Sequence, residues 1–190
     1  MKIASPQLHC AGIALAVLLA YSGIFAAHSA QDMQSPKETV LAASSQPVEL
    51  TANPVRVKLT SGTGDKNTGL DQMLESLPAS RNIYLVITGL HAVKEPGTLF
   101  HLYVDLPEGV TPKPDSAWHI GSINFYNAVP VPDAPKDKPE LPVSIDITGI
   151  LRNLHSSQKL TPDTTVTIMP TRPMEAGSEP MIGHIAITAN

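Results

Sequence analysis

Cysteine is almost absent from this sequence of 190 residues: the single one, Cys10, lies close to the N-terminus. The residues before it, Gln7-Leu8-His9, match a lipoprotein box poorly, so we expect no lipid anchor there. Without that N-terminal segment the chain has no thiol. This excludes disulfides, thiolate metal sites, cysteine nucleophiles and blue-copper centres, all of which need cysteine.

Charged and aromatic residues are also scarce. Only 16% of the residues are charged and 4% are aromatic, whereas prolines number 18, a combination that favours a compact, turn-rich β domain over a helical bundle. The formal net charge is −4 and no basic patch is evident, so we expect neither nucleic acid nor an anionic membrane as a partner. The length suits one domain, and its oligomeric state is left open.

The N-terminus has the three-part layout of a secretory signal peptide. Lys2 gives a positive start, an apolar run follows from Ala11 to Leu19, and small residues gather at 26–30. The apolar run is too short to span a bilayer comfortably. We therefore predict that residues 1–29 are a cleaved signal peptide and that the protein is exported, to the periplasm or outside the cell.

After the predicted cleavage site the chain is polar, small and aperiodic. We interpret residues 30–46 as a flexible leader and residues 47–190 as one β domain. Val55, Val57 and Leu59 alternate with polar residues, which is typical of a half-buried strand. The proline-rich stretch 129–142 is predicted to be an extended loop.

Alternation or β-branched composition predicts further strands at 82–90, 99–106, 118–126, 141–147, 164–169 and 182–188. We expect 99–106 to be the hairpin partner of 82–90. Helical spacing predicts two short helices, Leu70–Leu77 and Thr148–Leu154, the second capped by Thr148. The fold predicted is all-β: an antiparallel, immunoglobulin-like β-sandwich of about seven strands with two short helices.

The core candidates are apolar positions on the predicted strands and on the second helix. They are Ile83, Leu85, Ile87, Ile145, Leu151, Leu154, Val166, Ile168, Ile185 and Ile187.

No catalytic constellation is evident in the sequence, and we do not expect an enzyme. There is no Gly-x-Ser-x-Gly elbow, phosphate loop or zinc motif, and the histidines after the signal region lack helical ligand spacing. Asp105, Asp115 and Asp146 are dispersed, and strand-end or capping roles suit them. His101 and His119 are expected to be structural or surface histidines.

One stretch gathers soft metal ligands. Met169, Met174 and Met181 lie in or beside one loop, with His184 close behind, and thioethers suit Cu(I). Methionine is also a common filler of core gaps. Met174, Met181 and His184 are therefore candidate copper ligands; no other cofactor is expected.

Six segments of the chain form an ordered series of short motifs. They are Leu85-Val86-Ile87-Thr88-Gly89-Leu90, Leu99-Phe100-His101-Leu102-Tyr103-Val104-Asp105, Ile120-Gly121-Ser122-Ile123, Ile147-Thr148-Gly149-Ile150-Leu151-Arg152-Asn153-Leu154, Val166-Thr167-Ile168-Met169-Pro170 and Ile182-Gly183-His184-Ile185-Ala186-Ile187. In order, they resemble the LVIEGI, KFDV, Gly-Ser, ITxLLxxL, VTLVPR and IGxVxI motifs of the C-terminal β-sandwich domain of tyrosinases and plant-type polyphenol oxidases. The resemblance covers roughly residues 80–190. The Phe of KFDV is kept, but Leu99 and His101 replace its Lys and Asp.

The resemblance implies a non-catalytic domain. In that family it packs over the di-copper domain, shields the active-site entrance and can insert a side chain as a placeholder. These 190 residues contain no di-copper domain, so the implied role is docking in trans on a tyrosinase-like copper oxidase, as small caddie proteins do. Trp118, His119 and Tyr126 are the candidate partner-binding residues. The alternatives are a periplasmic copper-handling protein and a structural or adhesive β-sandwich.

Overall fold

The computed structural model describes residues 38–62, 68–130 and 141–190. Their elements, in chain order, are β1 (Thr39–Ser44), β2 (Val48–Glu49), β3 (Val55–Ser61), α1 (Leu70–Ser76), β4 (Ile83–His91), β5 (Phe100–Val104), β6 (His119–Ile123), β7 (Val143–Asp146), α2 (Thr148–Ser156), β8 (Thr165–Pro170) and β9 (Met181–Ala189). The predicted signal peptide, and residues 131–140 of the predicted proline-rich loop, lie outside this description. Among the described residues, no helix has the length and apolarity to cross a membrane.

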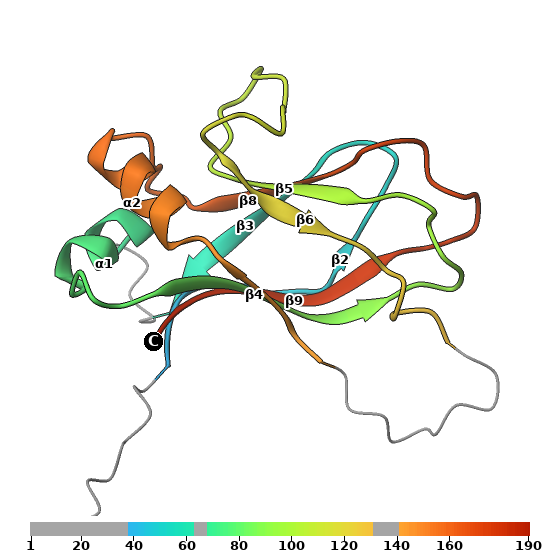
Figure 1. Ribbon diagram of the computed structural model, residues 1–190, viewed down its shortest axis with the longest axis horizontal. Helices are drawn as coiled ribbons and strands as arrows, with labels where there is room; N and C mark the ends of the chain where they lie inside the picture. The colour runs from blue at the N-terminus through green and yellow to red at the C-terminus, as the bar shows by residue number, and fades with distance from the viewer. Residues whose placement is uncertain (1–37, 63–67, 131–140) are drawn as a thin grey trace, which may run out of the picture. The chain divides into compact units, whose positions relative to one another are not determined.

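The strands form one continuous antiparallel sheet in the order β6-β5-β8-β3-β1-β9-β4-β7, with β2 beside β9. β3 joins its two halves, because it pairs with β8 on one side and with β1 on the other. In Figure 1 the half with β5, β6 and β8 crosses over the half with β4 and β9. β6 and β7, the strands at the two ends of this order, lie close to each other: a Cβ added to Gly121 of β6 would lie 3.1 Å from Ile145 Cδ1 of β7. The sheet is therefore curled until it is nearly closed.

The predicted fold is confirmed in outline and corrected in detail. The described chain is mostly antiparallel β with two helices, as expected. It has nine strands rather than about seven, and one sheet curled on itself rather than the two separate sheets of an immunoglobulin-like sandwich. The physical reason is β3, whose two edges are both hydrogen-bonded, so that neither half of the sheet ends there.

The sheet also begins earlier than residue 47. Thr39–Ser44, inside the segment predicted as a flexible leader, forms β1 and inserts between β3 and β9. Its sequence is short and rich in small residues, which gives little alternation to detect. Leu41 and Ala42 are nevertheless buried, because they pack in the hydrophobic core.

The predicted hairpin between residues 82–90 and 99–106 is wrong. β4 pairs with β9 along nearly its whole length and with β7 on its other edge. Both edges of β4 are therefore occupied, and β5 pairs with β6 and β8 in the other half of the sheet.

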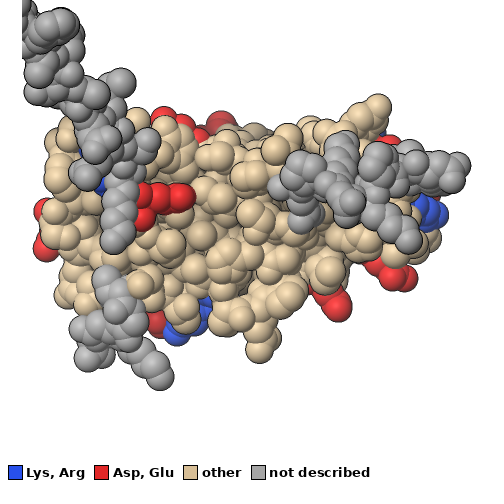
Figure 2. All heavy atoms as spheres, turned by 90° about the horizontal axis from the view of Figure 1, so that it is seen from below, with Lys and Arg blue, Asp and Glu red and all other residues tan. Residues whose placement is uncertain are grey.

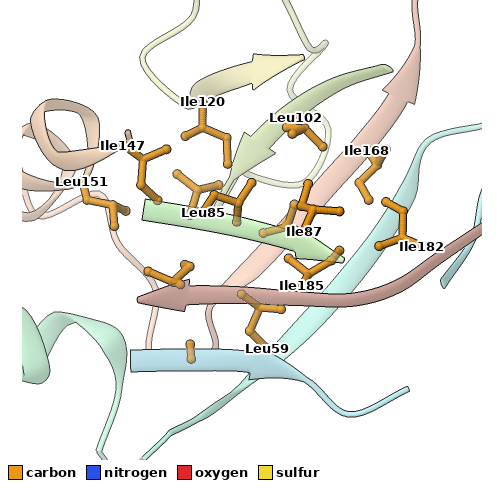
Figure 3. Close-up of a cluster of buried hydrophobic side chains, with 14 of the residues drawn as sticks. Leu59, Leu85, Ile87, Leu102, Ile120, Ile147, Leu151, Ile168, Ile182 and Ile185 are labelled. Atoms are coloured by element: carbon orange, nitrogen blue, oxygen red, sulfur yellow. The ribbon is translucent and has the colours of Figure 1, made fainter. Parts of the chain in front are cut away.

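The core lies between the two halves. Figure 3 shows Leu85 and Ile87 of β4 and Ile185 of β9 pointing into the same interior as Leu102 of β5 and Ile168 of β8. Nine of the ten core candidates are buried; the exception is Ile145 on the terminal strand β7, which is half-buried against the core.

The start of α2 differs from the prediction that Thr148 caps it. Ile147 is the N-cap residue, and the Asp146 carboxylate accepts a hydrogen bond from Thr148 N–H (2.9 Å). The Thr148 hydroxyl lies 2.7 Å from Ile83 N instead, so it ties the helix to the start of β4. α2 is also tied to α1, because His155 Nδ1 lies 2.5 Å from Asp71 Oδ1.

Candidate functional site

Two histidines meet on the β5–β6 ladder. His101 Nδ1 lies 3.3 Å from His119 Nε2, and the ring centroids are 4.9 Å apart at an interplanar angle of 87°. Ser122 Oγ lies 2.7 Å from His101 Nδ1. We call His101, His119 and Ser122 the histidine cluster.

A bulge in the ladder positions the histidine cluster. Leu102 is paired with Gly121 and Tyr103 with His119, so the register shifts by one residue between them. Such bulges re-aim side chains, and this one brings His119 toward His101. Gly121 sits at φ +143°, where a side chain is rarely tolerated, and a Cβ there would also press on Ile145.

The surroundings of the histidine cluster favour the neutral form of His119. Burial lowers the pKa of His119 below its ordinary 6.5, the neighbouring His101 lowers it further, and a hydrogen bond with the Gly121 backbone opposes both. Tyr103 packs against both rings, with centroids 5.2 Å from His119 and 6.3 Å from His101. Its hydroxyl is buried with no hydrogen-bond partner among the described residues, and burial together with the Asp115 charge raises its pKa.

The candidate partner-binding residues do not form one surface. Trp118 packs partly buried against the core, with Lys159 Nζ 5.5 Å from its ring centre, so it is held inward. His119 belongs to the histidine cluster. Tyr126 is 73% exposed and is the candidate that stands out into solvent.

The candidate copper ligands are spread out. Met174 packs partly buried against the core, while Met181 and His184 lie on β9. Met181 and His184 are three positions apart on an extended strand, about 10 Å along the chain. His184 Nδ1 faces Ser44 Oγ at 3.4 Å. Copper binding by Met174, Met181 and His184 stays a prediction. Within the described ranges, no group of three or more His, Cys, Asp or Glu residues is placed to hold a metal ion.

Two of the dispersed carboxylates have the structural roles expected of them. Asp105 follows β5 and accepts hydrogen bonds from Thr161 N–H (2.9 Å) and Thr165 N–H (2.7 Å). Asp146 ends β7 and orders the start of α2, and its hydrogen bonds with Thr148 lower its pKa.

No sequence motif singled out the outer face of the half-sheet β7-β4-β9-β1. Tyr84, Val86 and Thr88 alternate with the buried residues of β4 and therefore point outward. The pairing aligns them with outward positions on the neighbouring strands: Ser144, Asp146, His184, Ala186, Thr188, Val40 and Ala43. We call these ten residues the outer face.

Asp146 is the only charged residue of the outer face. Figure 2, seen from the side of β4 and β9, shows Lys, Arg, Asp and Glu side chains mainly toward the margins of the view. The signal was present in the sequence: the positions between the core residues of the central strands are apolar or uncharged, where a solvated strand usually carries charge.

Comparison with known proteins adds a family and a partial structural match. The family described as "Domain of unknown function (DUF7868)" matches residues 37–190. No curated protein matches the chain.

Among solved structures, latent apple tyrosinase aligns at 18% identity and a TM-score of 0.47, covering 76% of this chain and 27% of the other. A recombinant latent aurone synthase, a polyphenol oxidase, aligns at 17% identity and a TM-score of 0.46, covering 75% and 25%. The chain thus spans about a quarter of the length of these enzymes. It resembles polyphenol oxidases both in the six motifs and in this partial match.

Proposed function

This chain belongs to the family described as a domain of unknown function, DUF7868, and we propose that it is an exported, non-catalytic accessory domain that docks in trans on a tyrosinase-like copper oxidase. Docking uses the outer face of β7-β4-β9-β1. Export follows from the predicted signal peptide at residues 1–29.

The proposal of docking rests on the composition of the outer face. An antiparallel sheet that faces water usually alternates buried apolar residues with polar or charged ones. Here the outer face has one charged residue, Asp146, and offers Tyr84, Val86 and Val40 as contact residues, Val40 being 42% exposed. Two of its members, Ala186 and Thr188, are buried. Protein interfaces are depleted of charge at their centres because buried charges are costly to desolvate. A partner can therefore cover the outer face with a small desolvation free energy.

The choice of partner rests on the six motifs. They fall on six of the seven successive elements from β4 to β9: β4, β5, β6, α2 with the residue before it, β8 and β9. The seventh, β7, has no motif. In the family they resemble, this domain covers a di-copper domain. The oxidase proposed as the partner is a separate molecule. Tyr126, the most exposed of the candidate partner residues, is the side chain proposed to reach the active-site entrance.

A charge placed on the outer face tests the proposal. The purified protein is titrated against a tyrosinase-like oxidase that lacks its own C-terminal domain, and the dissociation constant is measured by biolayer interferometry. Val86→Lys is expected to weaken binding at least about tenfold, because the lysine must be desolvated at the interface.

Val110→Lys is the matched control. It makes the same change at an exposed valine in the loop between β5 and β6, and it is expected to leave binding unchanged. Absence of binding by the wild-type protein would contradict the docking function. Equal binding by Val86→Lys and wild type would contradict the choice of face.

A further inference from the structure

The spacing of the two imidazole nitrogens in the histidine cluster suits a shared metal ion. His101 Nδ1 and His119 Nε2 are 3.3 Å apart, longer than the usual 2.9–3.0 Å of an N–H hydrogen bond. Two nitrogens bound at roughly 2.0–2.1 Å to one tetrahedral Zn²⁺ lie about 3.3 Å from each other. The two rings are therefore already separated as two ligands of one tetrahedral ion would be.

The surroundings fix the position of His119, which is partly buried beside His101 and Tyr103. The hydrogen bond between His119 and the Gly121 backbone is of the kind that fixes the orientation of a metal-bound histidine. The β5–β6 bulge supplies a rigid base, because both histidines stand on hydrogen-bonded strands.

We propose that His101 Nδ1 and His119 Nε2 chelate one divalent late transition metal ion, with Zn²⁺ the ion that the geometry fits. The ion replaces the His101–Ser122 hydrogen bond, and Ser122 Oγ or water fills the remaining positions. The described residues provide no third His, Cys, Asp or Glu ligand, so the ion is exchangeable rather than permanently held. Tetragonal Cu²⁺ needs the nitrogens closer together than they are, although its higher intrinsic affinity makes it a competitor.

This inference does not depend on the proposed docking function, since metal binding is measured on the protein alone. The untagged, chelator-treated protein is titrated with ZnCl₂ at pH 7.5 by isothermal calorimetry. We expect one Zn²⁺ per chain. His101→Gln and His119→Gln should each weaken binding at least about tenfold, because losing one of two ligands destroys the chelate.

Two controls separate the histidine cluster from other ligands. His184→Gln removes an exposed histidine of β9, and the double change Met174→Leu with Met181→Leu removes the thioethers while keeping their bulk. Both are expected to bind Zn²⁺ as the wild type does. Circular dichroism identifies any variant that fails to fold. Ser122→Ala, at an exposed site, gives a further readout. It removes the hydrogen-bond partner of His101 Nδ1 and should weaken Zn²⁺ binding by no more than a few fold.

Three results would overturn the inference. The first is no Zn²⁺ binding by the wild-type protein, in which case the two rings share only a long hydrogen bond. The second is unchanged affinity in a folded His101→Gln or His119→Gln variant. The third is an equal loss of affinity in either control, which would place the metal elsewhere.

Discussion

The side chain of Asp105 ties the end of β5 to the start of β8. It sits at the end of β5 with a left-handed backbone (φ +46°) and is almost fully buried. Its two carboxylate oxygens each accept a hydrogen bond, one from Thr161 N–H and one from Thr165 N–H, at the entrance to β8. The carboxylate therefore fixes where β8 begins beside β5.

Asp105→Ala is expected to lower the free energy of unfolding by about 2–3 kcal/mol, because it leaves two backbone N–H groups without an acceptor. Asp105→Asn is the matched control. Asparagine tolerates the left-handed backbone and keeps one acceptor oxygen, so its loss should be smaller. Urea denaturation followed by circular dichroism measures both variants. Equal losses in the two would show that the hydrogen bonds to Thr161 and Thr165 contribute little.

Asp105 also predicts a pH dependence. Burial raises the pKa of its carboxyl above the ordinary 3.8, while the hydrogen bonds from Thr161 and Thr165 oppose the rise. A raised folded-state pKa means that the protonated form is favoured by folding. Its contribution to stability is complete below about pH 3.8 and is lost as the pH rises through the raised pKa.

The difference in unfolding free energy, wild type minus Asp105→Asn, should therefore fall as the pH rises from about 3.8 toward neutrality. Denaturation curves of both proteins over this range measure it, and the subtraction removes the titration of all other groups. A difference that grows with pH would mean that the hydrogen bonds, not burial, dominate this carboxyl.

At the scale of elements, the pairing of β4 with β9 depends on a pair of glycines. Gly89 adopts φ +70°, and a Cβ there would lie 2.7 Å from Gly183 Cα. The two backbones thus approach more closely than side chains permit. Both glycines belong to the six sequence motifs, and the contact gives those two positions a physical reason.

Gly89→Ala is expected to destabilise the protein by about 2–4 kcal/mol, from the left-handed backbone and the clash together. Gly149→Ala in α2 is the control: a Cβ there meets nothing within 4 Å, and alanine should stabilise the helix by about 0.5–1 kcal/mol. Thermal unfolding measures both. A neutral Gly89→Ala variant would show that the strands can separate without cost.

At the scale of the whole domain, a single core joins the two halves of the sheet. The buried cluster includes Leu85 and Ile87 from one half and Leu102 and Ile168 from the other, and Trp118 packs against it. The two halves should therefore unfold together rather than in sequence.

Leu85→Ala should cost about 2–5 kcal/mol and lower the denaturation midpoint equally by two probes. Far-UV circular dichroism reports the whole sheet, and the fluorescence of Trp118, the only tryptophan, reports the β5–β6 side. Coincident curves in wild type and variant are expected. Curves that separate in the variant would show that the two halves unfold independently.

The sequence by itself determined the elements whose residues carry their own local signal. Alternation or β-branched composition located the strands from β3 to β9, helical spacing located α1 and α2, and nine of the ten core candidates on these elements are buried. The roles of Asp105 and Asp146 also followed, because a carboxylate just past a strand has backbone N–H groups within reach.

Only the tertiary structure decided the pairing and the sites. β1 has too few alternating positions to be detected alone and becomes a strand because β3 and β9 pair with its two edges. The histidine cluster joins residues 18 positions apart through a register shift, and no sequence spacing encodes a shift of that kind. The outer face joins four strands drawn from both ends of the domain. Local sequence determines which way each strand faces, whereas its neighbours are chosen by the whole chain as it closes around one core.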